Sequence, residues 1–154
     1  MEDIMNEKKY GALKIENQLC FPLYACSREV IKQYTPYLNS IDLTYTQYIT
    51  MLALWEAHSL TVKELGQRLY LDSGTLTPLL KKLEAKGLVT RQRSAADERS
   101  LIVTLTENGT ALREEAVSIP GELAKCVNLT GEEAAQLYKL LYKLLENVNN
   151  ENEA

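Results

Sequence analysis

Apolar residues recur at helical spacing along most of this chain and at strand spacing in one short segment. Between residues 73 and 85, leucines are separated by four and three positions, which places them on one face of a helix. Between residues 101 and 105, Leu101, Val103 and Leu105 recur at every second position, as on the inward face of a strand. The apolar positions of the two segments are Leu76, Leu80, Leu83, Leu101, Val103 and Leu105. The pattern predicts a mainly α protein with a small β element.

Two short helices are predicted between Thr61 and Gly87. Thr61 and Glu64 have the spacing of a capping box, in which each side chain bonds the other residue's backbone amide, so the first helix begins there. Asp72 or Ser73 caps the second helix, and Gly87 supplies the left-handed residue that ends it. Two short helices joined by a tight turn predict a helix-turn-helix.

Two strands, 88–93 and 100–105, are predicted on either side of the loop SAADER. This loop is too long for a tight hairpin turn and has the length of a wing. The arginines around it are Arg91, Arg93 and Arg99. Asp97 is close enough in sequence to hold Arg99 through a charge-assisted hydrogen bond. Residues Thr61–Leu105 are therefore predicted to form a winged helix-turn-helix.

The outer face of the second helix is small and polar at its start and basic further along. It carries Ser73, Thr75, Thr77, Lys81 and Lys82. Hydroxyl donors followed by ammonium groups suit a helix that lies in the major groove of DNA. A solvated helix face has the same composition, so this feature alone leaves both interpretations open. With the wing, we expect a DNA-binding surface that also includes Arg91, Arg93, Asp97 and Arg99.

The distribution of charge favours the DNA-binding interpretation. The whole chain has a net charge of −4, whereas the segment from Lys81 to Arg99 holds six basic and three acidic side chains. The positive charge is therefore concentrated at the second helix and the wing. This pattern is typical of a protein that binds DNA through one element and excludes a generic nucleic-acid coat.

Composition limits the other possibilities. The chain has 154 residues, 45% of them hydrophobic and 25% charged, which predicts one globular domain with a substantial core. It lacks an apolar run long enough for a bilayer, and its charged start, MEDIMNEKK, is unlike a signal peptide, so we expect a cytoplasmic protein without membrane contact. Cysteine and histidine lack zinc-ligand spacing, so neither a metal nor a cofactor is expected, and His58 is interpreted as a surface turn residue.

Helices are also predicted on the N-terminal side of this region. The first begins close to Cys20, because Pro22 is tolerated only in a first turn, and it ends at Pro36. Its apolar face is Leu19, Leu23, Cys26, Val30 and Tyr34. A second capping box, Thr44 with Gln47, begins another helix. The apolar stripe of that helix is Tyr45, Tyr48, Leu52 and Trp55.

After the wing, a helix is predicted from Thr106 to about Ser118, followed by a break at Pro120 and a looser segment that carries Cys126. A last capping box, Thr130 with Glu133, begins a helix with an apolar stripe. The stripe is Ala134, Leu137, Leu141, Leu144 and Val148.

A winged-helix unit of residues 44–106 is too small to cover the apolar stripes at both ends of the chain. We therefore expect residues 16–40 and 107–149 to form a helical dimerisation region within a single domain of residues 1–154, and a two-fold dimer would present two recognition helices. The alternative is a monomer whose two ends pack on its own core.

Several segments resemble a known family. LYLDSGTLTPLLKKLE, GLVTRQRSAADERS and LTYTQY resemble the MarR family of dimeric winged-helix repressors, and ENQLCFPLYACSRE with the nearby tyrosines resembles its organic-hydroperoxide-sensing branch, OhrR. The resemblance covers roughly Glu16 to Asn147. One departure is Pro22, where an ordinary helix former is expected; it affects where the first helix starts.

The resemblance implies that Cys20 reacts with peroxide and that Tyr34 and Tyr45 donate hydrogen bonds to its sulfur. It also implies that Cys126 lies where some members carry a second, resolving cysteine, so the chain resembles the two-cysteine type. The start of a helix is itself a position that favours a thiolate. Cys26 lies about 240° around the helix from Cys20 and is interpreted as a core residue.

The expected function is that of a repressor which binds double-stranded operator DNA as a homodimer and is released when Cys20 is oxidised by an organic hydroperoxide. Apolar neighbours such as Phe21, Leu23 and Tyr48 would favour a lipid-like or aromatic peroxide. One alternative is a MarR-type repressor gated by a phenolic or lipophilic ligand without covalent chemistry. Another is a thiol peroxidase, although Asn17 replaces the threonine that a peroxiredoxin carries three residues before its nucleophile.

Overall fold

The computed structural model of this chain describes residues 9–94, 97 and 100–152. They divide into two compact units, one that ends at Ile119 and one that begins at Pro120. In chain order the elements are η1 (Gly11–Leu13), η2 (Ile15–Asn17), α2 (Cys20–Ser40), α3 (Tyr45–Ala57), β1 (Ser59–Thr61), α4 (Val62–Leu69), α5 (Ser73–Ala85), β2 (Val89–Arg93), β3 (Leu101–Leu105), α6 (Glu107–Ala116), α7 (Ile119–Val127) and α8 (Gly131–Asn152). The predicted fold class, mainly α with a small β-wing, is confirmed.

The sheet has three antiparallel strands in the order β1-β3-β2. The predicted hairpin is present, with Val89 opposite Leu105 and Arg93 opposite Leu101. The third strand, β1, was not predicted; it pairs with β3 and places Leu60 opposite Val103. Because β1 is only three residues long, it has no alternating pattern that sequence reasoning could detect.

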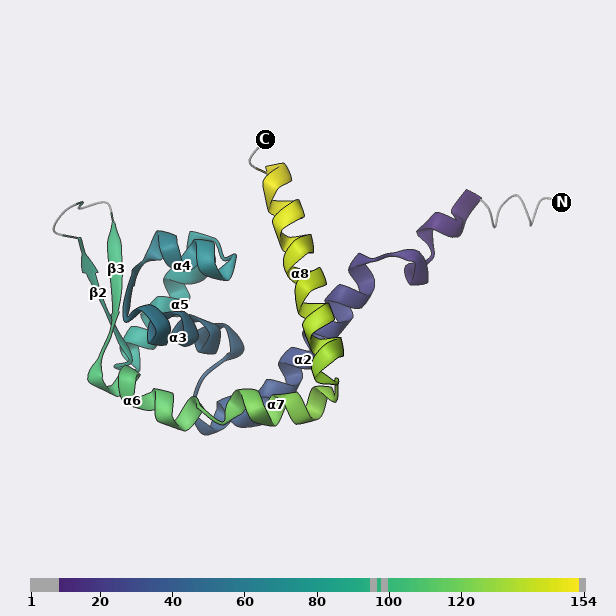
Figure 1. The fold of residues 1–154 in the computed structure, drawn as a ribbon. Helices are drawn as coiled ribbons and strands as arrows, with labels where there is room; N and C mark the ends of the chain where they lie inside the picture. Colours follow the sequence, from purple (N-terminus) through teal and green to yellow (C-terminus); the bar gives the residue numbers. More distant parts are fainter. Residues whose placement is uncertain (1–8, 95–96, 98–99, 153–154) are drawn as a thin grey trace. The chain divides into compact units, whose positions relative to one another are not determined.

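The core of the first unit lies where α3, α4 and α5 pack together beside the sheet (Figure 1). Its fully buried side chains come from all of these elements. They include Tyr48, Met51 and Leu54 from α3, Leu65 from α4, Leu76, Leu80 and Leu83 from α5, and Val89 and Val103 from the sheet. The predicted face of α5 is thus confirmed as the buried one.

The helix starts follow the predicted capping residues. Complete capping boxes at Thr44 and Thr61 begin α3 and α4, and the Asp72 carboxylate accepts the amide of Thr75 at 3.0 Å to begin α5. Gly87 follows α5 with φ +70, as predicted for the left-handed residue that ends it. These local rules alone position the helix-turn-helix.

The predicted end of α2 at Pro36 was wrong, because the helix continues to Ser40. Proline inside a helix removes one backbone hydrogen bond and costs about 3 kcal/mol. The next turn is nevertheless helical, because Leu38 is buried in the core with 2% exposure. The helix ends instead at the turn around Asp42, where φ is 51 and the amide of Leu43 bonds the carbonyl of Leu38.

The predicted apolar stripe of α3 was only partly right. Tyr48 is buried, but Leu52 is 42% exposed, whereas Met51 and Leu54 are fully buried. This helix packs against α2, α4, α5, α6 and the sheet, so it is apolar on several sides. A helix covered on several sides has a weak periodic signal, which explains the error.

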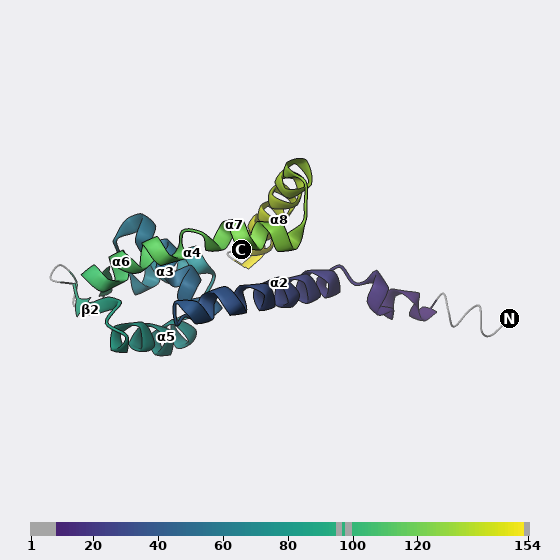
Figure 2. The same cartoon turned by 90° about the horizontal axis from the view of Figure 1, so that it is seen from below.

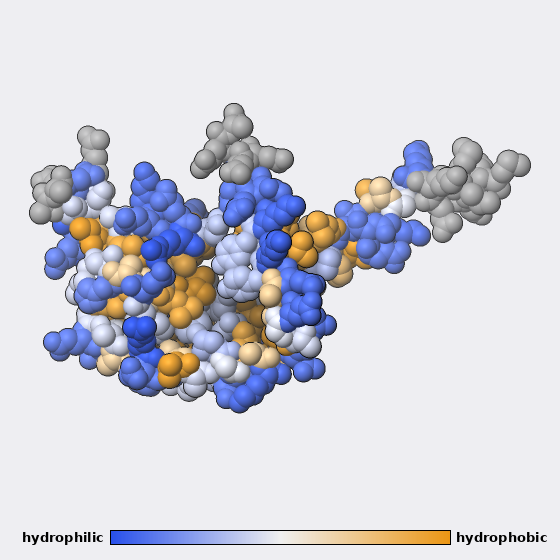
Figure 3. All heavy atoms as spheres, viewed as in Figure 1, coloured by the Kyte–Doolittle hydropathy of each residue, from blue (hydrophilic) through white to orange (hydrophobic). Residues whose placement is uncertain are grey.

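Most of α2 is exposed in the single chain, although it is one continuous helix (Figure 2). Of its residues only Leu38 is buried, while Leu19, Phe21 and Val30 at or near its N-terminal half are exposed. Leu13 and Ile15, which precede α2 in the chain, are also exposed. Figure 3 shows hydrophobic residues on the surface of this N-terminal segment. The first unit therefore covers the predicted apolar face only toward its C-terminal end, where Tyr34 packs against the core.

The second unit consists of α7, apart from its first residue, and α8. The predicted loose segment around Cys126 was wrong, because Ile119–Val127 is helical. Pro120 is the second residue of this helix, where a missing amide proton costs nothing. A hydrogen-bonded box between Thr130 and Glu133 begins α8, as predicted. The large apolar side chains of α8 are exposed; they include Leu137, Tyr138, Leu140, Leu141, Tyr142, Leu145 and Val148.

Candidate functional site

The outer face of α5 presents the five predicted side chains to solvent. Ser73, Thr75, Thr77, Lys81 and Lys82 are all exposed. Two of the hydroxyls donate within the helix start: Thr75 to Asp72 Oδ2 at 2.8 Å and Thr77 to the Ser73 carbonyl at 2.7 Å. These bonds hold the hydroxyl oxygens in place, and each oxygen keeps an acceptor site. Contact with DNA requires these side chains to be exposed, and they are; their role in DNA binding remains a prediction.

The arginines of the wing differ from one another. Arg93 is exposed, whereas the Arg91 side chain is only 18% exposed and bonds Glu84, with 3.0 Å from Nε and 2.6 Å from Nη2 to Oε2. Arg91 thus has a carboxylate partner from α5, and its predicted place in the DNA-binding surface stays a prediction. Arg99, and with it the predicted pair with Asp97, lies outside the described residues. Within the described residues, the Asp97 carboxylate accepts the hydroxyl of Ser100 at 2.8 Å.

Hydrogen bonds keep two carboxylates of this surface ionised. The side chain and amide of Thr75 hold the pKa of Asp72 below its ordinary value, and the Arg91 guanidinium does the same for the pKa of Glu84. Both carboxylates are therefore negative at neutral pH. The charge of Glu84 is compensated by Arg91, whereas Asp72 is hydrogen-bonded to neutral groups, the amide and hydroxyl of Thr75.

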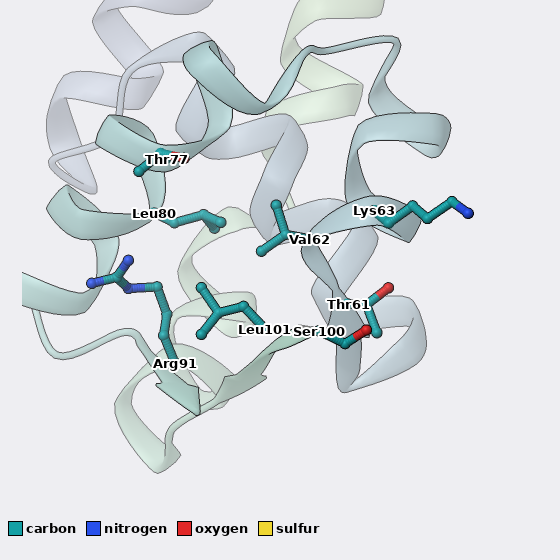
Figure 4. Close-up of a pocket in the computed structure, with 8 residues that line it drawn as sticks. All are labelled: Thr61, Val62, Lys63, Thr77, Leu80, Arg91, Ser100 and Leu101. Atoms are coloured by element: carbon teal, nitrogen blue, oxygen red, sulfur yellow. The ribbon is translucent and has the colours of Figure 1, made fainter. Parts of the chain in front are cut away.

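A cavity of about 310 Å³ lies between α4, α5 and the hairpin (Figure 4). Val62, Leu80 and Leu101 point toward one another across it, while the ammonium group of Lys63 points away. Its remaining lining residues are Thr61, Thr77, Arg91 and Ser100. The cavity is thus apolar in the middle, with hydroxyls and one guanidinium at its edge.

The predicted reactive thiol occupies the predicted place in the helix. Cys20 is the first residue of α2 and is exposed. Pro22 lies in the first turn, where its missing amide is tolerated. Cys26 is also exposed, so its interpretation as a core residue was wrong for this chain. The periodic pattern correctly placed Cys26 on α2 but could not show which faces of α2 are covered.

Tyr34 and Tyr45 are neighbours. Their ring centroids are 5.0 Å apart, and Tyr34 also lies 5.8 Å from Tyr48. Burial raises the pKa of Tyr45, and burial together with the Tyr45 charge raises the pKa of Tyr48. A raised pKa keeps the phenol protonated at neutral pH, so Tyr45 remains a hydrogen-bond donor.

Cys20 lies too far from this tyrosine pair within one chain. Cys20 and Tyr34 belong to the same helix, fourteen residues apart, and a rise of 1.5 Å per residue separates them by about 21 Å. A tyrosine hydroxyl cannot span that distance. The predicted hydrogen bonds from Tyr34 and Tyr45 to the Cys20 sulfur therefore cannot form inside one chain.

Sequence reasoning missed Glu84 as a partner of Arg91. The two residues are seven positions apart, but a helix end, the Gly87 turn and a strand start lie between them, so a count along one helix face does not pair them. It also missed Trp55, whose indole donates to the Gly109 carbonyl at 2.7 Å and joins α3 to α6. His58 is an exposed turn residue at φ 62, as predicted.

Among the described residues, no cluster of His, Cys, Asp and Glu has the arrangement of a metal site. No helix in the described part of the chain is long and apolar enough to cross a membrane.

Comparisons with known proteins agree with the winged-helix geometry. Residues 32–116 match the family model described as transcriptional regulator SarA/Rot. The organic hydroperoxide resistance transcriptional regulator of Bacillus subtilis is 53% identical over 146 residues, which is 95% of this chain and 99% of that protein.

Solved structures show the same similarity. AbfR of Staphylococcus epidermidis superposes with a TM-score of 0.73 at 35% identity, covering 92% of this chain and 98% of AbfR. A MarR variant from E. coli in complex with operator DNA gives a TM-score of 0.72 at 31% identity, covering 82% of this chain and 93% of MarR. These relatives are transcriptional regulators and not enzymes, which decides against a thiol peroxidase. The chain belongs to the MarR family of winged-helix transcriptional regulators, in the branch of the organic hydroperoxide resistance regulator.

Proposed function

We propose that this protein is a repressor that binds operator DNA as a homodimer and releases it when an organic hydroperoxide oxidises Cys20. One observation carries the proposal: an exposed cysteine begins α2, in a chain whose α5 presents a polar and basic face. The relatives support it, since structures of AbfR include reduced and overoxidised forms bound to DNA and a form with a disulfide.

DNA recognition divides between α5 and the wing. The hydroxyls of Ser73, Thr75 and Thr77 lie at the start of α5, where they would face base edges or phosphates of the major groove. Lys81 and Lys82 lie further along and would contact phosphates. Arg93 and Arg99 are assigned to the wing, while Asp97 positions the wing turn through Ser100.

The dimer follows from the apolar residues that a single chain leaves exposed. Leu19 and Phe21 at the start of α2 and Leu137, Tyr138 and Leu141 on α8 are all exposed. Groups of exposed apolar side chains of this size are typical of a protein interface. A two-fold dimer would place two α5 helices on a two-fold operator.

A dimer would also bring Cys20 of one copy close to the tyrosines of the other. Fourteen residues bring Tyr34 to within about 40° of the same helix face as Cys20. If two copies of α2 pack antiparallel through that face, Tyr34 of each copy lies beside Cys20 of the other. Tyr45 accompanies Tyr34, because their rings are in contact. The thiol site is therefore proposed to contain a cysteine from one copy and two phenol donors from the second.

The chemistry begins with the Cys20 thiolate, which the two phenols and the start of α2 stabilise. Its sulfur attacks the terminal peroxide oxygen, the O–O bond breaks, and the alkoxide leaves as the alcohol after it takes a proton. Cys20 is then a sulfenic acid. The Cys126 thiol of the second copy attacks this sulfur, an S–S bond forms, and water leaves. The disulfide changes the arrangement of the helices and lowers DNA affinity.

DNA binding under oxidation tests the proposal. Fluorescence anisotropy on operator DNA should show a loss of affinity of about 5- to 150-fold after cumene hydroperoxide, with recovery on addition of dithiothreitol. Cys20→Ser should bind DNA when untreated and remain bound under peroxide. Cys26→Ser is the matched control, since it removes an exposed thiol of the same helix. Release of Cys20→Ser by peroxide would disprove the role of Cys20.

The role of Cys126 has a separate test. Non-reducing gel electrophoresis after stoichiometric cumene hydroperoxide should show a covalent dimer for wild type and for Cys26→Ser. The dimer should be absent for Cys20→Ser and Cys126→Ser. A covalent dimer in Cys126→Ser would contradict the disulfide and leave a different oxidised form of Cys20 as the switch.

The cavity favours a second candidate function, release of DNA by a phenolic or lipophilic ligand without oxidation. Leu80 and Val62 could contact an aromatic ring, and Thr77 could bond a hydroxyl or carboxylate. Anisotropy with a phenolic acid under reducing conditions tests it, with Val62→Leu as the variant, because the larger side chain narrows the cavity at a residue outside the proposed DNA surface. Release of wild type but not of Val62→Leu would support ligand gating; no release of wild type contradicts gating by that ligand.

A further inference from the structure

Arg91 does not have the environment of a DNA-contacting arginine. Its guanidinium directs Nε and Nη2 at the same carboxylate oxygen of Glu84, at 3.0 and 2.6 Å. The side chain is 18% exposed, in contrast to the exposed Arg93 two residues later in the same strand. Two of the five N–H donors of Arg91 are therefore used on Glu84, and the low exposure of the side chain limits the access of DNA to the other three.

The pair connects the two elements that would contact DNA. Glu84 lies in the last turn of α5, and Arg91 lies in β2, which leads into the wing. Between them the chain turns at Gly87, with the amide of Leu88 bonded to the carbonyl of Leu83. These backbone bonds fix the turn and the pairing with β3 fixes β2 within the sheet, so any further direct link between α5 and the middle of β2 must come from side chains.

Apolar packing supplies only part of that support. The cavity of about 310 Å³ lies between α5, α4 and the hairpin, and Arg91 lines it together with Leu80 and Leu101 (Figure 4). Close packing holds the start of β2, where Val89 is buried, whereas the space beside Arg91 leaves the middle of the strand less closely packed against α5. Two donors of the planar Arg91 guanidinium converge on one oxygen of Glu84, and this contact can add to the packing there.

We propose that Glu84 and Arg91 are positioning residues that hold the wing at a fixed angle to α5, so that both elements reach DNA together. The inference rests on the proposed DNA-binding function and gives Arg91 a positioning role in place of the direct DNA contact predicted from the sequence. Glu84 also neutralises the charge of Arg91, so Arg91 contributes little to the release of counterions from DNA.

Glu84→Gln separates positioning from direct contact by the sign of its effect. If Arg91 contacts a phosphate, removal of the nearby negative charge releases the guanidinium and strengthens binding. If the pair positions the wing, the same substitution weakens binding about two- to fivefold, although it removes a charge that repels DNA. Glu114→Gln, an exposed glutamate of α6, is the control for loss of one negative charge.

Arg91→Lys gives a second, independent comparison. Lysine keeps the positive charge but cannot form the planar two-bond contact. A positioning role therefore predicts weaker binding in Arg91→Lys and an unchanged slope of log K against log salt. Lys81→Ala should instead make that slope shallower by about 0.9, the value for one lost phosphate contact. In the double variant Glu84→Gln/Arg91→Lys, the loss should be no greater than in the weaker-binding single variant, because both act on one contact.

All of these measurements use the full-length protein under reducing conditions, with fluorescence anisotropy on operator DNA. Thermal denaturation confirms that each variant is folded. Weaker binding by Glu84→Gln, with Glu114→Gln at or above the wild-type affinity, supports the inference. If the wild type binds operator DNA and Glu84→Gln binds it equally or more tightly, the positioning role is overturned. The separate peroxide experiment tests the proposed function alone. Because no oxidant is present here, its failure would leave the positioning role untouched.

Discussion

The winged-helix region and the terminal helices differ in how much of their apolar surface one chain can cover. In α4 and α5, Leu65 and Leu83 are completely buried. On α8, Leu137 is 46% and Tyr138 65% exposed, although this helix also carries an apolar stripe. The apolar face of the first region is therefore covered within a single chain, whereas that of α8 is not, which is the basis of the proposed dimer interface.

The proposed chemistry divides in the same way. The DNA-contacting residues belong to the region that one chain completes, while Cys20 lies at the exposed end of α2. Tyr34, further along that helix, contacts the core through Tyr45 and Tyr48. A single continuous helix thus extends from the thiol to the core beneath the DNA-binding elements. A change at Cys20 can reach α5 through displacement of this helix.

The largest expected effect comes from the completed region. Leu54 is fully buried in α3, so Leu54→Ala should lower the free energy of unfolding by about 2–5 kcal/mol at any protein concentration. Leu137→Ala, the same substitution on α8, should have an effect that shrinks as the protein is diluted, because the proposed dimer would bury Leu137 and the single chain leaves it 46% exposed. Urea denaturation at several protein concentrations measures both. Equal, concentration-independent losses would show that the two regions do not differ.

The wing should show the next largest effect. Arg99→Ala should cost about 1–3 kcal/mol of operator binding if its guanidinium enters a groove. Because each chain carries its own wing, the loss should appear on a half-site as well as on the full operator. Anisotropy with the two DNA lengths makes this comparison. Unchanged affinity on both would remove Arg99 from the DNA-binding surface.

A charge on the exposed face of α8 should break the dimer. Leu137→Glu should weaken self-association at least tenfold, which corresponds to about 1.4 kcal/mol. Leu52→Glu is the matched control, because Leu52 is also a partly exposed leucine, at 42%, but lies on α3 in the completed region. Analytical ultracentrifugation distinguishes the two. Dissociation by Leu52→Glu, with Leu137→Glu still dimeric, would place the interface elsewhere.

The smallest expected effect is on stability at acidic pH. The Thr61 amide and hydroxyl donate to Glu64 at 2.7 and 2.8 Å and hold the pKa of this carboxyl below 4.5. A pKa lowered by folding means that the unfolded chain takes up the proton first as pH falls. The stabilisation is therefore complete at neutral pH and is lost below 4.5.

Glu64→Gln removes the titrating group and should reduce the acid sensitivity of the completed region slightly. Thermal denaturation of wild type and variant, at neutral pH and at values below 4.5, measures the difference. Glu133→Gln makes the matched change in the capping box of α8, whose carboxyl pKa is lowered in the same way. An identical pH dependence of wild type and Glu64→Gln would show that this box adds nothing to stability.

Local rules predicted most of the fold. The capping residues Thr44, Thr61 and Asp72 and the glycine at 87 act on their own helix ends, so sequence alone identifies them. Pro36 was misjudged because burial of Leu38 outweighs a local cost. The length of β1 is below what a periodic pattern can reveal.

The residues of the candidate site could be predicted from the sequence, but their contacts with other elements could not. Cys20 at a helix start and the hydroxyls of α5 follow from one element each. The partner of Arg91 comes from a different element, Glu84 in α5, and chain order does not show such a contact. The exposure of Cys26 depends on what covers α2, which a helical stripe cannot specify.

The central claim is that the thiol site is shared between two copies, and a mixed dimer of Cys20→Ser with Tyr34→Phe tests it directly. In a shared site, Cys20 of the Tyr34→Phe copy meets Tyr34 of the Cys20→Ser copy, so one complete site is restored. In a site within one chain, neither copy has both residues. The rate at which cumene hydroperoxide oxidises Cys20 in the purified mixed dimer should therefore equal the wild-type rate per thiol. If Cys20 is oxidised as slowly in the mixed dimer as in the Tyr34→Phe homodimer, the account is contradicted.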